Sequence, residues 1–318
     1  MKRVYVTGGN GFLGHSVVRG LAAAGDEVEL VVSADLREPA DEHIIDGVLY
    51  EQADVTDAKV ISDQILDHEI DTVVHLASIV NPGKSTTTEQ EYAVDVTGSK
   101  NVLEACVRHG VKRIIVSSSG AAYGYHADNP GWLKETDPVR GTETFPYSLH
   151  KRLVEEMLVE YKESDPYLEQ VVLRIGTILG RSVDNQITDL FRAKRLVKIR
   201  GSDSPFVFIW DQDVVAIMLQ AVLGDKTGIF NVAGDGSMTV DEIAKELGKG
   251  TLPIPVGVLK AGLKVGQKLG KTPHGPDQTD FLQYRPVLDN TRLKEDFGYT
   301  PKYTTREAFK AWQAANGL

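Results

Sequence analysis

Hydrophobic and polar positions form two alternating kinds of segment over the first half of the chain. Short apolar runs predict buried strands at residues 4–6, 28–34, 47–50, 72–76, 113–117 and 171–175. Between them, apolar residues at helical spacing predict helices up to residue 24 and over residues 59–66, 90–109 and 147–162. Strands that alternate with helices form a parallel sheet covered on both faces. We therefore predict an α/β fold with a doubly wound parallel sheet.

The regular alternation fades after about residue 176, which predicts a division into two domains. Residues 1–175 form the first domain, and strands near 206–234, at 206–209 and 229–232, are expected to return to it. Residues 176–318 are expected to form mainly a smaller, irregular cap, because this part carries several prolines: Pro253, Pro255, Pro273, Pro276 and Pro286.

A glycine-rich turn joins the first predicted strand to the first predicted helix. Gly8 can take the tight turn, Gly11 lets the backbone approach a pyrophosphate, and Gly14 lets the helix pack closely on the strand. The helix N-terminus beyond Phe12 and Leu13 offers free N–H groups and a favourable dipole to a phosphate. This turn predicts a dinucleotide-binding domain of the Rossmann type, with the cap as the substrate-binding part.

Two acidic positions extend the predicted cofactor site. Asp35 ends the second strand, where a carboxylate accepts hydrogen bonds from ribose hydroxyls and repels a 2′-phosphate. Arg37 would instead attract that phosphate, so NAD is favoured while NADP remains possible. Asp54 and Val55 follow the third strand, where a carboxylate can accept from the adenine amino group. The alternative for this segment is a helix N-cap at Thr56 or Asp57.

Candidate acid–base chemistry begins at Tyr147, four residues before Lys151 on one face of a predicted helix. A neighbouring ammonium favours the phenolate form of a tyrosine, whose ordinary pKa of about 10 is otherwise too high for neutral pH. Ser117, Ser118 and Ser119 end the preceding strand, at the sheet edge where such folds bind ligands.

Several motifs in the same order carry a resemblance to a known family. They are the glycine loop, Asp54-Val55, His75-Leu76-Ala77, Ser119 before Tyr123-Gly124, Tyr147 with Lys151, and later Leu173-Arg174 and Asp211 to Val214. With these the chain resembles the extended short-chain dehydrogenase/reductases, specifically the NAD-dependent epimerase/dehydratase group.

The resemblance implies roles for individual residues. Tyr147 would be the general acid/base, Lys151 would support its phenolate and hold the nicotinamide ribose, and Ser119 would bind the substrate oxygen. The adenosine path would be lined by Leu76, Ala77 and Ser78, and Ser117 would lie in the cofactor site. Homodimers would form through the helices at 90–109 and 147–162.

The chain departs from the family pattern at a few positions. Asp95 replaces an asparagine of the family's proton relay, so that the relay is in doubt, unless Asp95 only orients its helix. Thr177 and Phe206 replace an asparagine and an arginine that serve a sugar nucleotide's diphosphate. A nucleotide-sugar substrate is thus disfavoured. Arg181 and Arg200 are candidates to compensate for the missing arginine, with surface or salt-bridge roles as the alternative.

Dehydratases carry an Asp-Glu pair where this chain has Gly120-Ala121, so dehydratase chemistry is not expected. His126 and His150 are expected at polar surface positions, with proton transfer as the alternative. A group of aromatic residues is expected in the core, with a less polar pocket wall as the alternative: Tyr123, Tyr125, Phe145, Phe206, Phe208 and Trp210. Residues 256–269 predict an amphipathic helix with a solvated lysine stripe at Lys260, Lys264 and Lys268, or a cap over the substrate.

Composition narrows the classes of protein. The formal net charge of −10 argues against nucleic-acid binding, and no apolar run reaches membrane-spanning length or forms a signal peptide. Cys106 is the single cysteine, expected as a small buried apolar residue, which fits a reducing cytoplasm. No cluster of histidine, cysteine and carboxylate indicates a metal site.

Three functions remain in competition. The first is an NAD(P)-dependent oxidoreductase that transfers hydride between nicotinamide and a secondary alcohol or ketone, a small-molecule substrate other than a nucleotide sugar. The second is a nucleotide-sugar epimerase. The third is a catalytically silent NAD(P)-binding sensor or scaffold, against which the set of Ser119, Tyr147 and Lys151 argues.

Overall fold

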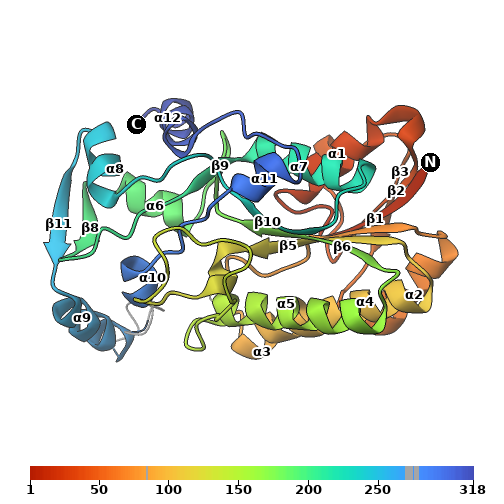
Figure 1. Cartoon of the computed structure of the whole chain (residues 1–318), viewed down its shortest axis with the longest axis horizontal. Helices are drawn as coiled ribbons and strands as arrows, with labels where there is room; N and C mark the ends of the chain where they lie inside the picture. The colour runs from red at the N-terminus through yellow and green to blue at the C-terminus, as the bar shows by residue number, and fades with distance from the viewer. Residues whose placement is uncertain (84, 269–274, 276–278) are drawn as a thin grey trace.

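A seven-stranded parallel sheet forms the centre of the computed structural model, which describes residues 1–83, 85–268, 275 and 279–318 (Figure 1). Its strand order is β10-β6-β5-β4-β1-β2-β3. The strands are β1 (Lys2–Thr7), β2 (Val28–Asp35), β3 (Val48–Gln52), β4 (Thr72–His75), β5 (Arg113–Ser119), β6 (Glu169–Ile175) and β10 (Gly228–Val232). All neighbouring pairs are parallel, so the predicted doubly wound α/β fold is confirmed.

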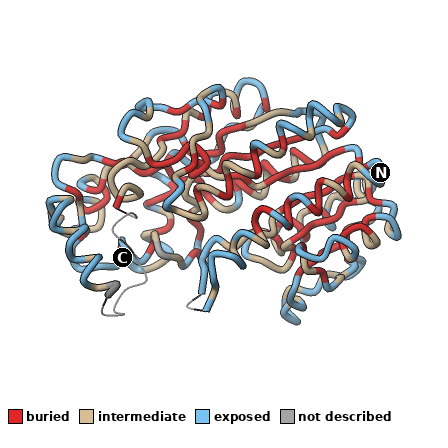
Figure 2. Tube along the Cα trace, turned by 90° about the horizontal axis from the view of Figure 1, so that it is seen from below, coloured by how far each residue is buried: buried red, intermediate tan, exposed pale blue. Residues whose placement is uncertain are grey.

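Helices cover both faces of this sheet (Figure 1). One face carries α1 (Gly14–Ala22), α7 (Asp211–Leu223) and α11 (Thr291–Glu295). The other face carries α2 (Ala58–Asp67), α4 (Gly98–Arg108) and α5 (Pro146–Ser164). Along β1, Val4 and Val6 enter the first core and Tyr5 enters the second, as the two-residue period of a strand requires. Buried residues accordingly lie along the strands and inner helix faces (Figure 2).

The helix predicted at residues 90–109 is interrupted. It consists of α3 (Thr88–Tyr92), a π-helical turn at Ala93–Thr97, and α4. π turns are rare and are often found at functional sites. The wider turn changes which face of the helix the following residues occupy, and it carries Asp95, which is buried.

Of the two strands expected to return to the first domain, only one does. Residues 228–232 form β10, which pairs with β6 at the edge of the main sheet. The strand predicted at 206–209 is instead β9 (Phe208–Trp210), which pairs with β7 (Thr177–Leu179) in a separate two-stranded sheet. The prediction was wrong because β10 already occupies the edge of the main sheet beside β6.

The part expected to be irregular contains regular elements. β8 (Arg195–Ile199) pairs with β11 (Gly250–Ile254), and the helices there are α6 (Gln186–Arg192), α8 (Val240–Glu246), α9 (Val256–Lys268), α10 (Thr279–Gln283) and α12 (Thr305–Ala315). Capping boxes at Thr239 with Glu242 and at Thr304 with Glu307 start α8 and α12. These elements surround an aromatic core that includes Phe191, Phe206, Phe208, Phe309 and Trp312.

A buried ion pair ties the main sheet to helix α5. The Arg174 guanidinium on β6 lies 2.6 Å from Glu155 Oε2 on α5, and both side chains are 4% exposed. Arg174 Nη1 also donates to the Tyr123 hydroxyl at 2.8 Å, and the Ser118 hydroxyl donates to Glu155 Oε1. Burial opposes the charge of Arg174, but the Glu155 carboxylate outweighs burial and raises the pKa of the guanidinium. The pair fixes the strands that carry the candidate site.

Candidate active site

The glycine loop has the geometry that its sequence predicts. Gly8 has a φ of 67°, and a Cβ there would lie 2.9 Å from the backbone nitrogen of Ala77. A Cβ on Gly14 would lie 2.1 Å from the Gly8 carbonyl oxygen, so only glycine lets α1 start this close to the turn. The amide of Gly11 donates to the same carbonyl at 3.0 Å. The loop is therefore a compact turn that brings the N-terminus of α1 to the end of β1.

Asp35 lies beside this loop at the end of β2. Its carboxylate accepts from the amide of Asn10 at 3.1 Å and from the amide of Arg37 at 3.1 Å. The Asn10 side chain in turn donates to the Arg37 carbonyl, so the carboxylate is held against the glycine loop. The Arg37 side chain is exposed. Asp35, which favours NAD, and Arg37, which would favour NADP, thus lie next to each other beside the glycine loop.

The segment after β3 contains the N-cap that the sequence offered as an alternative. The Asp54 carboxylate accepts from the Thr56 amide at 2.8 Å and from its hydroxyl at 2.7 Å, which closes a local turn. Asp57 is the N-cap of α2 and accepts from the amides of Lys59 and Val60. Val55 is buried against Gly98 of α4. The N-cap is therefore Asp57, and Asp54 stays half-buried beside it.

At the carboxyl edge of the sheet, where β5 ends at Ser119, Lys151 on α5 contacts both Ser117 and Tyr147. The Lys151 ammonium donates to the Ser117 carbonyl at 2.9 Å and lies 5.6 Å from the centre of the Tyr147 ring. Ser119 ends β5, and its hydroxyl accepts from the Ala121 amide at 3.1 Å. Lys151 is buried, while Tyr147 and Ser119 are half-buried. A half-buried tyrosine ring with an ammonium over its face thus lies on α5 beside this edge.

His75 and Thr7 connect this edge to the glycine loop. The Thr7 hydroxyl lies 2.7 Å from Nδ1 of His75 and accepts from the amides of Leu76 and Ala77. Burial, together with the nearby Lys151 charge, lowers the pKa of His75 to about 3 and outweighs the opposite effect of Asp95. His75 is therefore neutral and holds the end of β4, with Leu76 and Ala77, against β1.

Asp95 and His150 form a buried pair next to Lys151. Asp95 accepts from the Ser78 hydroxyl at 2.9 Å, from the Ile79 amide at 2.8 Å, and from His150 Nδ1 at 3.0 Å. His150 is 1% exposed, so its predicted surface position was wrong. It precedes Val154 and Leu158 at four-residue spacing, and these buried residues mark the inner face of α5. That spacing was the available signal in the sequence.

A cavity of about 210 Å³ opens between the glycine loop and the cap. Its lining comes from the start of α1, the segment after β7 and the start of α7: Phe12, Leu13, His15, Ser16, Ser182, Asp211, Gln212 and Val215. The cap segment that carries Ser182 thus faces the predicted phosphate site.

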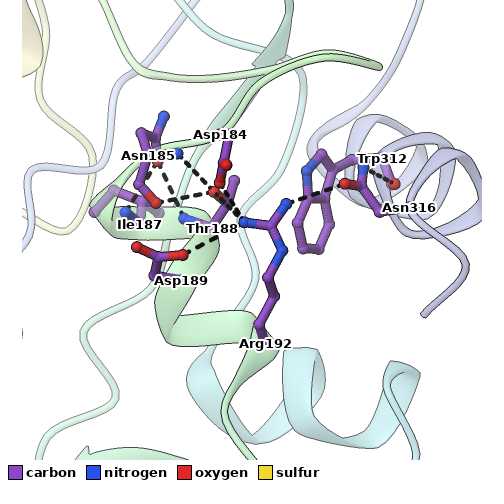
Figure 3. A network of polar contacts seen from close by, with 8 residues as sticks. All are labelled: Asp184, Asn185, Ile187, Thr188, Asp189, Arg192, Trp312 and Asn316. Carbon is purple, nitrogen blue, oxygen red and sulfur yellow. Dashed lines mark hydrogen bonds and ion pairs between the residues drawn. The ribbon is translucent and has the colours of Figure 1, made fainter.

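A polar network fixes this cap segment (Figure 3). Asn185 caps α6 by accepting from the amides of Ile187 and Thr188. Arg192 forms ion pairs with Asp184 and Asp189 and donates to the Asn316 side chain at 3.1 Å, while its guanidinium lies over the ring of Trp312 (Figure 3). The segment between β7 and α6 is therefore held by the C-terminal helix.

Arg285 is a half-buried cation of the cap that the sequence analysis did not consider. Its guanidinium stacks on the Phe206 ring at 3.8 Å and lies 5.2 Å from the centre of the Phe281 ring. Its only hydrogen-bond partner among the described residues is Ser204, at the carbonyl and the hydroxyl oxygen, and its buried Nε has none. Burial lowers the pKa of Arg285 to about 9, although the nearby Tyr125 acts in the opposite direction.

Tyr125 connects Arg285 to Tyr147. Its ring packs on Phe281 and Phe145, with centroids 5.3 and 5.5 Å away. Burial and the neighbouring Tyr147 raise the pKa of Tyr125, while Arg285 opposes them. Tyr125 and Arg285 thus share a neighbour, the Phe281 ring, whose centre lies 5.2 Å from the Arg285 guanidinium. Of the aromatic residues expected in the core, Phe145 is half-buried, and the others are buried there: Tyr123, Tyr125, Phe206, Phe208 and Trp210.

The remaining residues that the sequence singled out lie on the surface, in the core or in α9. Arg181 and Arg200 are exposed, and His126 is half-buried near the Arg140 carbonyl. Cys106 is fully buried in the core. In α9, the Lys260 ammonium lies 3.8 Å from the Asp280 carboxylate. The structure does not describe the side chain of Lys268, nor residues Leu269, Pro273 and Pro276.

No metal-binding cluster of histidine, cysteine and carboxylate occurs among the described residues. Within the same part of the chain, every helix is too short or too polar to cross a membrane.

The chain is similar to proteins of known family. A family model described as the NAD dependent epimerase/dehydratase family matches residues 4–233. An uncharacterised protein of Mycobacterium bovis is 25% identical over 324 residues, covering 100% of this chain and 85% of that protein. The UDP-glucose 4-epimerase of Erwinia amylovora is 32% identical over 192 residues, covering 58% of this chain and 56% of that enzyme. The Thermus thermophilus UDP-glucose 4-epimerase, solved in complex with NAD, has 25% identity and a TM-score of 0.73, with 99% of each chain covered.

Proposed function

Because the chain belongs to the NAD-dependent epimerase/dehydratase family, a family of enzymes, we propose that it transfers hydride between NAD and a secondary hydroxyl or ketone group of a small molecule. Tyr147 exchanges the hydroxyl proton, the Lys151 ammonium supports its phenolate, and Ser119 donates to the substrate oxygen. The observation that carries this proposal is the Lys151 ammonium, 5.6 Å from the Tyr147 ring at the sheet edge that faces the glycine loop.

The residues around the glycine loop fit NAD. Free amides at the start of α1 would bind the pyrophosphate, and Asp35 would accept from the adenosine ribose and disfavour a 2′-phosphate. Asp54, Val55, Leu76, Ala77 and Ser78 would line the adenosine path. NAD supplies the hydride acceptor at its nicotinamide ring.

The substrate, we propose, carries an anionic group that binds Arg285. Arg285 is half-buried with a buried Nε and has no carboxylate partner among the residues that the structure describes, so a phosphate or carboxylate of the substrate would compensate its charge. The sequence disfavours a nucleotide sugar because Phe206 replaces an arginine, yet Arg285 stacks on the face of that same ring. Arg285 therefore supports a second candidate, a nucleotide-sugar epimerase, which has the same hydride chemistry on a diphosphate substrate.

A substrate panel tests the proposal. The protein with NAD is incubated with secondary alcohols, hydroxy acids, sugar phosphates and nucleotide sugars, and both NADH formation and sugar products are measured. Net NADH formation supports a dehydrogenase, an epimerised sugar without NADH supports the second candidate, and tight NAD binding without any turnover would favour a silent sensor.

Substitution of Arg285 tests the binding of the anionic substrate group independently of hydride transfer. In Arg285→Met we expect KM for an anionic substrate to rise on the order of 100-fold, since a charged hydrogen-bonded contact is lost. NAD affinity stays unchanged, and the exposed Arg200→Met variant behaves like the wild type. An unchanged KM in Arg285→Met would refute the anionic group.

We further propose a homodimer formed through α4 and α5. Sedimentation of the purified protein tests it, because a species with the mass of a single chain at micromolar concentration would exclude the dimer.

A further inference from the structure

Helix α9 has two apolar faces, and only one of them lies against the protein. The first face is half-buried and consists of Val256, Leu259, Leu263 and Gly266. The second face also has helical spacing and is exposed; its residues are Val258, Ala261, Gly262 and Val265. Val258 is 63% exposed and Val265 is 57% exposed. Because a surface helix normally carries polar side chains on its outer face, an exposed apolar face of this kind indicates a further partner.

Two lysines lie along one edge of the exposed face. Lys260 and Lys264 are one helical turn apart, and both are exposed. The Lys260 ammonium lies 3.8 Å from the Asp280 carboxylate of α10, and Lys264 has no ion pair among the residues that the structure describes. Residues 247–268 include four lysines and neither aspartate nor glutamate, although the whole chain has a formal charge of −10. This segment is therefore cationic in an acidic protein.

Helix α9 lies at one end of the molecule. The strand β11 leads into it, and both lie at the end of the cap that is far from the N-terminus (Figure 1). Apolar side chains are exposed on the neighbouring sheet too, since the register partners Val197 on β8 and Leu252 on β11 are each 42% exposed. An extended surface can therefore approach this end without meeting the main sheet.

The sequence of α9 gives the helix little stability of its own. Three of its 13 residues are glycines, which are the least favourable helix formers after proline, and three are β-branched valines. Contact with the rest of the cap covers only the first face. A partner that covers the second face would therefore stabilise the helix as well as bury its valines.

We propose that the exposed face of α9 binds the surface of a membrane that contains anionic lipids. Val258 and Val265 enter the boundary between headgroups and acyl chains, while Lys260 and Lys264 contact lipid phosphates at the edge of the helix. A lipid surface fits better than a protein, because the exposed face lacks the aromatic residues and arginines that anchor protein interfaces. The helix lies on the membrane and does not cross it. Since two valines bury little area, binding is reversible and depends on charge.

Co-sedimentation of the full chain with lipid vesicles tests this proposal. One set of vesicles contains phosphatidylcholine and phosphatidylglycerol in equal amounts, and the other contains phosphatidylcholine alone. The variants are Lys264→Gln and the double variant Val258→Ser with Val265→Ser. Their matched controls carry the same kinds of substitution elsewhere: Leu66→Ser on α2, where Leu66 is 55% exposed, and Lys226→Gln in the exposed loop before β10.

We expect the wild type to bind the mixed vesicles and not the vesicles of phosphatidylcholine alone. The partition coefficient for the mixed vesicles should fall on the order of tenfold in the double valine variant, because less apolar area is buried. It should fall about fivefold in Lys264→Gln, because one charge near the lipid surface is lost. Both controls should bind like the wild type, and added salt should weaken binding. Absent binding of the wild type, equal binding to both kinds of vesicle, or unchanged binding in the double valine variant would overturn the proposal.

Measurements without lipid check that the variants are folded and test a second copy of the chain as the other candidate occupant of the exposed face. Urea denaturation and NAD affinity should equal those of the wild type, because the three substituted side chains of α9 are exposed. If a second copy covered this face, sedimentation velocity would show an assembly that the double valine variant dissociates, and the membrane proposal would be wrong. None of these measurements uses turnover. Lipid binding by a chain that turns over no substrate of the panel would therefore support this inference and count only against the proposed function.

Discussion

Removal of the Arg174 guanidinium should destabilise the protein far more than removal of a surface charge. In Arg174→Met the Glu155 carboxylate keeps its hydrogen bond from Ser118 but loses its contacts to Arg174 Nε and Nη2 at 2.6–3.1 Å. The Tyr123 hydroxyl loses its bond to Nη1. The substitution therefore leaves a buried carboxylate without its cation.

The magnitude follows from burial. Breaking a buried ion pair by removing one partner costs about 3–5 kcal/mol, and both side chains here are 4% exposed. Since whole proteins are stable by about 5–15 kcal/mol, the loss is a large fraction of the total. Methionine fills much of the arginine volume, so the loss reflects charge and hydrogen bonding rather than a cavity.

Urea denaturation followed by circular dichroism and tryptophan fluorescence measures the loss. The control is Arg306→Met, since Arg306 pairs with Glu242 and Glu246 at 2.7 Å but is 42% exposed. Such an exposed pair should contribute less than about 1 kcal/mol. The double variant Arg174→Met with Glu155→Leu should recover much of the stability, because no unpaired charge remains. Equal losses in Arg174→Met and Arg306→Met, or no recovery in the double variant, would refute the reasoning.

Three further outcomes are expected. Gly14→Ala should weaken NAD binding about tenfold or more by calorimetry, because its Cβ would lie 2.1 Å from the Gly8 carbonyl and displace the loop; unchanged affinity would contradict the close-packing role. The pKa of His75 is lowered to about 3 in the native state. Between about pH 6.5 and about pH 3 the unfolded state therefore binds more protons than the native state, and the free energy of unfolding falls as the pH drops. Between about pH 7 and about pH 5, the free energy of unfolding measured by urea denaturation should fall by about 2 kcal/mol less in His75→Gln than in the wild type. An equal fall in both proteins would contradict this role of His75. Thr239→Ala should cost about 1 kcal/mol by removing the capping box of α8, as seen by chemical denaturation, whereas no change would show that packing alone holds this helix.

The sequence was most informative where local pattern and tertiary structure agree. The strands of the first domain are continuous apolar runs, since both faces of a parallel sheet are buried, and each was predicted within a few residues. The glycine loop could also be predicted, because its spacing reflects steric limits within a few residues of chain. Such features depend on near neighbours.

Features that depend on distant partners escaped prediction. β9 pairs with β7 rather than with the main sheet because β10 takes that edge, which no local pattern reveals. Arg285 stands in no local motif, and its contact with Phe206, 79 residues away along the chain, forms only when the cap folds. The π turn at Ala93–Thr97 has the composition of an ordinary helix, so the contact of Asp95 with His150 was not expected.

The central claim is that Tyr147 exchanges the substrate proton during NAD-linked hydride transfer. Its most direct test compares Tyr147→Phe with Tyr161→Phe, a control on the same helix, by measuring turnover and NAD affinity with one substrate from the panel. We predict that Tyr147→Phe loses about 100- to 10,000-fold in kcat while its NAD affinity and the activity of Tyr161→Phe stay at wild-type values. Turnover in Tyr147→Phe within a few-fold of the wild type would contradict the account.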